Sequence, residues 1–104
     1  MSTWFVSRHP GARDWATRHG LTVDRFVAHL HEERLQPGDR VIGTLPINLI
    51  TELQRRGCTY LHLVLKIPPE LRGKELSADQ LDAYGAGLRA YRVEEDPLPG
   101  SLPS

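Results

Sequence analysis

The stretch Trp4–Ala16, WFVSRHPGARDWA, joins an apolar run to a helical pattern through a polar turn. The β-branched and aromatic residues of Thr3–Val6 predict a short buried strand. Pro10-Gly11 interrupts that strand, and the apolar spacing that follows predicts a helix over Ala12–His19, ending at Gly20. A strand followed at once by a helix is the building unit of α/β proteins.

The middle of the chain continues this alternation. Val23–Leu30 fits both a helical face and a strand, and we interpret it as a strand. A strand at Arg40–Thr44, a helix within Leu45–Gly57 and a strand at Tyr60–Ile67 follow. The connection between the second and third strands, about nine residues, is too short for a parallel crossover. Those two strands therefore either form an antiparallel hairpin or are not neighbours.

The last part of the chain predicts one more helix and a tail. Ser77 followed by Gln80 is a capping box, and it predicts a helix whose apolar residues are Leu81, Tyr84, Leu88 and Tyr91. From Glu94 the chain is acidic and then rich in Pro and Ser, which predicts a disordered tail over 94–104. We expect one α/β sandwich domain over 1–93, with a mainly parallel or a mixed sheet.

Composition and charge narrow the classes of function. Arg and Lys together number 13, as do Asp and Glu, so the net charge is zero. A protein that coats long nucleic acids would carry a basic excess. Eleven of the basic residues are Arg, which favours planar recognition of phosphate. The single cysteine, Cys58, excludes an intrachain disulfide and favours the reducing cytoplasm. We expect no signal peptide and no membrane span.

Polar side chains follow two of the predicted strands where each one ends. They are Ser7, Arg8 and His9 after the first strand, and Thr44 and Asn48 around the end of the third. Ligands of open α/β sheets bind beyond the carboxyl ends of parallel strands, and helix starts attract anions there. If the two strands are neighbours, these side chains form one anion-binding crevice. His9 would then be a candidate acid or base, since histidine titrates near neutrality.

These residues also have structural interpretations. The hydroxyl, guanidinium and imidazole of the first turn fit a solvated surface, with the guanidinium paired to a carboxylate. Thr44 and Asn48 fit helix caps around Pro46. Arg72–Lys74 is a short basic loop after the strand Tyr60–Ile67, and it fits either a solvated connection or a loop that closes over a polyanion.

Three motifs resemble a small accessory family of type III CRISPR systems: FVSRHPGA at 5–12, GDRVIGTLPINL at 38–49 and RGKELSADQL at 72–81. The similarity covers most of the chain, from about Trp4 to Val93. It implies a Rossmann-like fold related to CARF domains. It also implies a ring nuclease, which cleaves the cyclic oligoadenylate messenger of type III immunity and switches the response off. Where the family often has an acidic residue after "HL", this chain has His31.

The resemblance also implies site residues. The first motif supplies the catalytic candidates Ser7, Arg8 and His9. The other two supply ligand contacts at Gly43, Thr44, Pro46, Asn48, Arg72 and Gly73. The implied reaction is in-line attack of a ribose 2′-hydroxyl on the adjacent phosphodiester, which needs no metal ion or cofactor. Because a ring of four adenylates has at least twofold symmetry, we expect a homodimer with the ring near its interface.

Other functions fit parts of this pattern. A protein that sequesters the messenger would need the same crevice without a positioned acid or base. SRHPG also resembles the motif of phosphatases that phosphorylate a histidine, but those motifs have Gly directly after His, where this chain has Pro10. In a structural or interaction protein, the polar strand ends would only cap helices.

Overall fold

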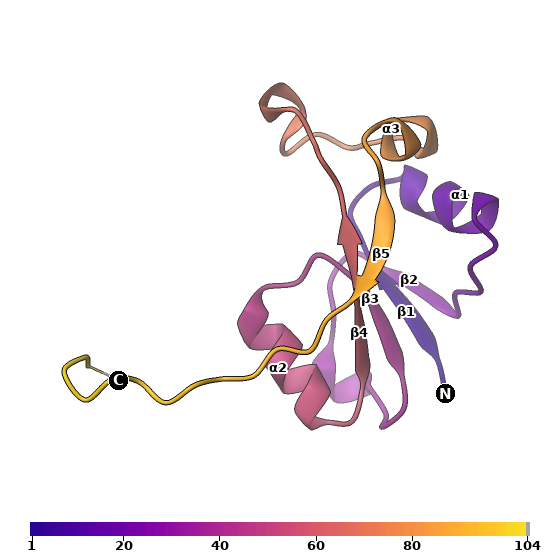
Figure 1. The fold of residues 1–104 in the computed structure, drawn as a ribbon. Coiled ribbons are helices and arrows are strands. Elements are labelled where there is room, and N and C mark those ends of the chain that lie inside the picture. Colours follow the sequence, from indigo (N-terminus) through magenta and orange to yellow (C-terminus); the bar gives the residue numbers. More distant parts are fainter. Residues whose placement is uncertain (104) are drawn as a thin grey trace.

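The computed structural model describes residues 1–103 and contains one five-stranded sheet with helices on both faces (Figure 1). Along the chain, the elements are β1 (Thr3–Val6), α1 (Gly11–Arg18), β2 (Arg25–Val27), β3 (Arg40–Gly43), α2 (Ile47–Arg55), β4 (Thr59–Val64), α3 (Ala78–Ala83) and β5 (Gly87–Ala90). Two single turns of 3-10 helix, η1 (Glu32–Arg34) and η2 (Pro69–Leu71), lie in the connections.

The strands lie in the order β2-β1-β3-β4-β5. The pairs β2-β1, β1-β3 and β3-β4 are parallel, and β5 runs antiparallel to β4. The predicted α/β fold with a mainly parallel or mixed sheet is confirmed. Because β1 lies between β2 and β3, the second and third strands are not neighbours. The antiparallel pair of the sheet is formed instead by its last two strands.

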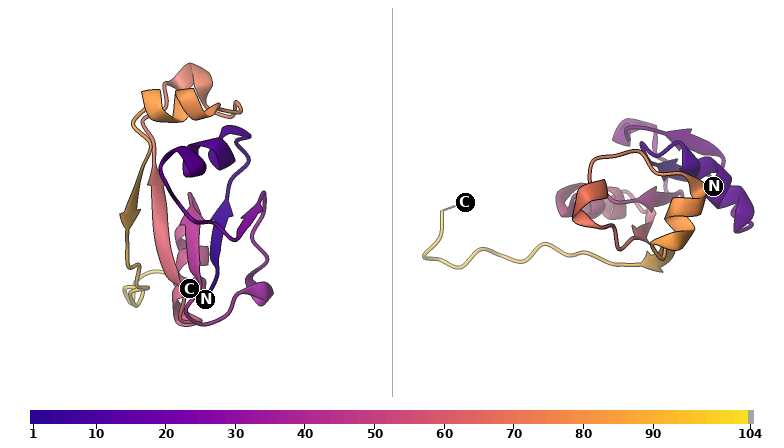
Figure 2. Two further views of the ribbon diagram at one scale, coloured as in Figure 1. Left: turned by 90° about the vertical axis from the view of Figure 1, so that its right-hand side faces the viewer. Right: turned by 90° about the horizontal axis from the view of Figure 1, so that it is seen from above.

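Helices cover both faces of the sheet (Figure 2), and each face carries its own hydrophobic cluster. Successive residues of a strand point to opposite faces, so Phe5 packs with α1 and α3 while Trp4 packs with α2. Trp15 of α1 lies edge-on to Phe5, with ring centroids 6.4 Å apart. Trp4 and Trp15 are only 3% and 2% exposed, so both tryptophans belong to the core.

The last helix is shorter than the apolar spacing predicts. The capping box is present: the Gln80 amide donates to Ser77 Oγ at 3.2 Å, and the Ser77 amide donates to Gln80 Oε1 at 2.9 Å. The helix ends because Gly85 adopts φ +74°, the left-handed conformation that closes helices. Leu88 lies in β5 and Tyr91 follows it, so the prediction that both lie on the helix is wrong.

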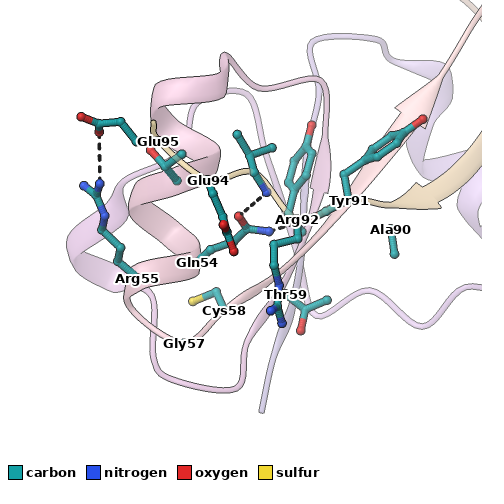
Figure 3. A pocket seen from close by; sticks show the side chains of 13 residues that line it. Gln54, Arg55, Gly57, Cys58, Thr59, Ala90, Tyr91, Arg92, Glu94 and Glu95 are labelled. Carbon is teal, nitrogen blue, oxygen red and sulfur yellow. Dashed lines mark hydrogen bonds and ion pairs between the residues drawn. The ribbon is translucent and has the colours of Figure 1, made fainter. Parts of the chain in front are cut away.

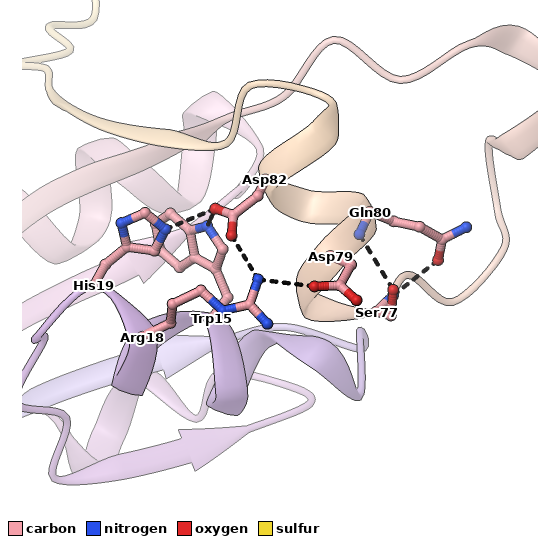
Figure 4. Close-up of polar contacts among 7 residues, drawn as sticks. All are labelled: Trp15, Arg18, His19, Ser77, Asp79, Gln80 and Asp82. Carbon is pink, nitrogen blue, oxygen red and sulfur yellow. Dashed lines mark hydrogen bonds and ion pairs between the residues drawn. The ribbon is translucent and has the colours of Figure 1, made fainter.

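Asp82 of α3 connects that helix to α1 (Figure 4). Its carboxylate accepts hydrogen bonds from the Trp15 indole at 3.0 Å, from Arg18 at 2.7 Å and from His19 at 2.7 Å. Arg18 also pairs with Asp79 at 3.0 Å. The hydrogen bonds from Arg18 and then His19 lower the pKa of Asp82. These contacts hold α3 against the second half of α1.

Candidate functional site

The carboxyl ends of β1 and β3 meet at a cavity of about 850 Å³. From β1 the chain crosses one face through α1 to reach β2, whereas from β3 it crosses the other face through α2 to reach β4. Because the chain leaves β1 and β3 on opposite faces of the sheet, a crevice forms between the ends of these two strands. Open α/β proteins bind their ligands in such a crevice. The cavity is lined by the turns after β1 and β3 and by the loop before α3.

Most of the predicted site residues line this cavity, namely Ser7, Arg8, His9, Thr44, Pro46, Arg72 and Gly73. Arg8 and Thr44, which lie far apart in the chain, therefore meet as the strand-end argument predicts. Gly43 and Asn48 are not among the lining residues. Gly43 is buried beside β1, where an added Cβ would come within 3.0 Å of the Val6 carbonyl oxygen. The absence of a side chain at Gly43 therefore allows β1 and β3 to approach each other closely.

Thr44 and Asn48 do not cap α2, contrary to their structural interpretation. The residue before the helix is Pro46, and no side chain bonds to the first turn there. Asn48 is the second residue of the helix, and its carbonyl accepts a hydrogen bond from the Thr51 hydroxyl at 2.8 Å. Thr44 is exposed at the cavity, so its hydroxyl is accessible to a ligand.

The first backbone amides of α1 are hydrogen-bonded to carbonyl groups of the protein itself. The Gly11 amide donates to the Leu76 carbonyl at 3.1 Å, and the Ala12 amide donates to the His9 carbonyl at 3.0 Å. These two amides are therefore not open to an anion, which corrects the expectation for this helix start. An anion on this side of the cavity would therefore have to bind to side chains. Arg8, which lines the cavity there, is exposed.

His9 is fixed by the same loop. Its Nδ1 accepts a hydrogen bond from the Leu76 amide at 3.1 Å, and its own amide donates to Ser7 Oγ at 3.0 Å. Burial lowers the pKa of His9, although the nearby Glu75 carboxylate acts in the opposite direction. The neutral imidazole with an accepting Nδ1 carries its proton on Nε2. Because the Ser7 hydroxyl oxygen accepts the bond from the His9 amide, its own proton can be donated to another acceptor.

The cavity has a local excess of positive charge. Arg8, Arg72 and Lys74 line it together with one carboxylate, that of Glu75. Within residues 1–103, none of these three cations forms an ion pair with a carboxylate. Because the whole chain has no net charge, this concentration distinguishes the cavity and favours an anionic ligand.

Two histidines at this end of the sheet did not enter the predicted site. His29 follows β2 and lines the large cavity. The predicted strand Val23–Leu30 placed His29 inside the strand, whereas β2 ends at Val27, so the strand-end argument did not identify it. His62 lies within β4 and lines an adjoining cavity of about 260 Å³ together with residues that include Ser7, His9 and Thr44.

His62 belongs to a hydrogen-bonded cluster around Tyr60 Oη. Tyr60 is 1% exposed, and burial raises its pKa. Its Oη lies 2.9 Å from the Gly43 carbonyl oxygen and 2.7 Å from His62 Nδ1, and it accepts a hydrogen bond from the Leu45 amide at 3.0 Å. Tyr60 thus connects the end of β3 to the imidazole of the neighbouring strand.

A second large cavity, of about 870 Å³, lies between α2 and the segment after β5 (Figure 3). The Gln54 carboxamide holds that segment, since it donates to the Tyr91 carbonyl at 2.8 Å and accepts from the Val93 amide at 2.9 Å. Its lining includes two arginines and two glutamates, Arg55, Arg92, Glu94 and Glu95. Charge is balanced there, and the cavity adjoins the start of β4, so we place the candidate site at the other end of the strands.

Comparison with known proteins identifies one family. Residues 4–94 match the model of a family described as "Putative CRISPR-associated protein (Cas_VVA1548)". The match includes the turns after β1 and β3 and the loop before α3. No curated protein and no solved structure matches the chain. Within residues 1–103, none of the helices has the length and apolar character that crossing a membrane requires.

Proposed function

Because the chain belongs to this family of CRISPR-associated proteins, we propose that it is a ring nuclease that binds and cleaves a cyclic oligoadenylate, with cyclic tetra-adenylate as the first candidate. One observation carries the proposal. The three motifs whose resemblance implies this activity, at 5–12, 38–49 and 72–81, each contribute residues to the 850 Å³ cavity.

The charge of the cavity supports a phosphodiester ligand. Arg8 and Arg72 each offer a planar guanidinium, which suits the paired oxygens of a phosphate. Lys74 adds a third cation to the lining of the cavity. The reversal of strand order beside β1 is in keeping with a Rossmann-like, CARF-related fold, in which ligands occupy this crevice.

The proposed reaction is an internal transesterification. A ribose 2′-hydroxyl attacks the adjacent phosphorus in line, the bond to the 5′ oxygen breaks, and a linear product with a 2′,3′-cyclic phosphate results. The protein holds the ribose and phosphate in line and stabilises charge on the phosphorane. In this proposal Arg8 binds the phosphate oxygens, and Ser7 and His9 hydrogen-bond to the reacting group; all three residues line the cavity.

We further propose that the protein acts as a homodimer in the cytoplasm. A ring of four adenylates presents each of its groups at least twice about a twofold axis. A dimer with the same symmetry offers two copies of Arg8, Arg72 and Thr44 to matching phosphates. The cavity of one chain is open to solvent on its rim, where Arg72 and Gly73 are exposed.

The decisive experiment incubates the protein with labelled cyclic tetra-adenylate in the presence of EDTA. A linear product supports the ring nuclease. Unchanged ligand in a tight complex supports instead a protein that sequesters the messenger, and the absence of both binding and product contradicts both functions. Cyclic tri- and hexa-adenylate, used in parallel, report the preferred ring size.

Two arginine variants show whether the ligand occupies this cavity. Arg8→Ala removes a lining guanidinium, and we expect ligand affinity to fall about 10- to 100-fold, as for loss of a charge-assisted contact. Arg40→Ala is the matched control, because Arg40 begins β3 at the opposite end from the cavity and is also exposed. Equal affinity of both variants would place the ligand elsewhere.

A further inference from the structure

We infer that His62 is the proton acceptor of this site and that His9 is a fixed hydrogen-bond donor beside it. The inference rests on the proposed ring nuclease function, and it assigns different roles to two histidines that line the same 260 Å³ cavity. The roles follow from what each Nδ1 contacts, because the partner of one ring nitrogen decides which nitrogen carries the proton.

The first assignment starts at Tyr60, whose hydroxyl has one proton and three neighbours. The Leu45 amide can only donate to it, and the Gly43 carbonyl can only accept from it. If Tyr60 donated to His62, the Tyr60 and Gly43 oxygens would face each other at 2.9 Å with no hydrogen between them. All three contacts are satisfied when Tyr60 donates to Gly43 and accepts a hydrogen bond from His62 Nδ1. His62 then carries its proton on Nδ1, and Nε2 keeps a free lone pair.

The second assignment has the opposite result. A backbone amide can only donate, so the bond from Leu76 makes His9 Nδ1 an acceptor. His9 therefore carries its proton on Nε2. Protonation of Nδ1 would break the contact with Leu76, whose side chain is fully buried, so His9 is held as a neutral donor. Burial, which lowers the pKa of His9, acts in the same direction.

A donor and an acceptor at one cavity suit the proposed reaction. The 2′-hydroxyl gives its proton to Nε2 of His62 as its oxygen forms a bond to phosphorus. The bond from phosphorus to the 5′ oxygen breaks, and that oxygen takes a proton from water. His62 then returns its proton to solvent. The Nε2–H of His9 donates a hydrogen bond to a phosphate oxygen while charge builds on it. Tyr60 is a positioning residue, since it acts through His62.

Asparagine variants separate the two roles with little change of structure. In His62→Asn, the side-chain amide takes the place of Nδ1–H and still donates to Tyr60, but Nε2 is lost. In His9→Asn, the side-chain oxygen takes the place of Nδ1 and still accepts from Leu76, but the Nε2–H is lost. We expect H62N to cleave cyclic tetra-adenylate about 100- to 10,000-fold more slowly in single turnover. Its affinity for a 2′-O-methyl analogue, which cannot react, should stay within about threefold of wild type.

The pH profile distinguishes an acceptor from a structural residue. The titratable and charged groups around His62 are Tyr60 on β4, Arg89 opposite it on β5, Tyr91 edge-on to its ring, and His9 across the cavity. Protonation of Nε2 removes the acceptor, so the wild-type rate should fall at acid pH. We expect that acid limb to be absent in H62N and retained in H9N. Loss of the limb in H9N alone would exchange the two roles and overturn the inference.

The outcomes separate this inference from the proposed function. Wild-type protein that leaves cyclic tetra-adenylate intact contradicts the nuclease and the inference together. Wild-type protein that cleaves, with H62N cleaving at the same rate, overturns the inference alone. If H62N does not fold, the ring nitrogens of the wild-type protein still decide the matter through their ¹⁵N chemical shifts. We expect Nδ1–H on His62 and Nε2–H on His9, and the reverse pattern on either ring would overturn the assignment.

Discussion

Gly11 lies directly against the backbone of Ala78, so that a Cβ added at Gly11 would collide with the amide nitrogen of Ala78 and the carbonyl carbon of Ser77. The Gly11 amide also bonds to the Leu76 carbonyl. The first helix start and the third motif are thus packed backbone to backbone. This contact, together with the bond from Leu76 to His9, positions the basic loop over the cavity.

Gly11→Ala is expected to be strongly destabilising. The atoms in the way belong to the backbone at the capping box and cannot rotate aside, so we expect the free energy of unfolding to fall by about 3 kcal/mol or more. Urea denaturation followed by tryptophan fluorescence measures the loss. Gly20→Ala is the control: Gly20 has φ +70° but no heavy atom within 4 Å of the added Cβ, so about 1 kcal/mol is expected. Similar losses in the two variants would contradict the close packing at Gly11.

His9→Ala should destabilise the protein apart from any effect on activity. It leaves the buried Leu76 amide without a partner, which costs about 1–3 kcal/mol, and His9→Asn should recover most of that loss. Because burial lowers the pKa of His9, the unfolded chain binds this proton more readily than the folded one. The contribution of His9 is therefore complete above about pH 6.5 and is lost as the pH falls through the lower folded pKa. Urea titrations from pH 8 to pH 5 should show a smaller decline in H9N than in wild type.

The location of the candidate site could be predicted from the sequence, because the carboxyl ends of parallel strands share one edge of a sheet. That rule correctly brought Arg8 and Thr44 together. It could not separate lining residues from neighbours on the same turn, so Gly43 and Asn48 were included although neither lines the cavity. The capping box at Ser77 was equally predictable, because it depends on residues three apart in the chain.

The features that sequence reasoning missed depend on contacts between distant residues. Leu88 and Tyr91 continue a helical spacing after Leu81, and only Gly85 signals that the helix has already ended. β5 exists because it can pair with β4, a partner that no local pattern identifies. The tautomer of His62 likewise depends on Tyr60 and on backbone groups of the turn after β3.

Asp39→Asn is expected to lower stability by about 3 kcal/mol, because its buried carboxylate accepts three hydrogen bonds. They come from the Ser2 amide at 2.9 Å, the Gln36 amide at 2.9 Å and the Trp4 indole at 3.2 Å. Burial alone would raise the pKa of Asp39, but these donors outweigh it and the pKa is lowered. The side-chain NH₂ of asparagine cannot accept, so at least one donor loses its partner. Thermal unfolding at pH 7 measures the loss, and an unchanged Tm would contradict the role of the carboxylate.

Asp82→Asn should weaken the junction of α1 and α3 in a manner that depends on salt and pH. Hydrogen bonds from Arg18 and then His19 lower the pKa of Asp82, so its contribution is present above the unfolded pKa of about 4. That contribution is lost as the pH falls through the folded pKa. We expect D82N to lower the Tm by a few degrees at pH 7 and low salt. The difference from wild type should shrink in 1 M NaCl, which screens partly exposed charges.

Asp79→Asn provides the matched control for this junction, because Asp79 pairs with the same arginine. The Asp79 side chain is 89% exposed and that of Asp82 is 33% exposed, and only Asp82 also accepts from the buried Trp15 indole. Water therefore competes far more effectively for Asp79 than for Asp82, and D79N should leave the Tm nearly unchanged. Equal shifts in D79N and D82N would show that charge alone, and not the shared acceptor for Trp15, Arg18 and His19, holds the two helices together.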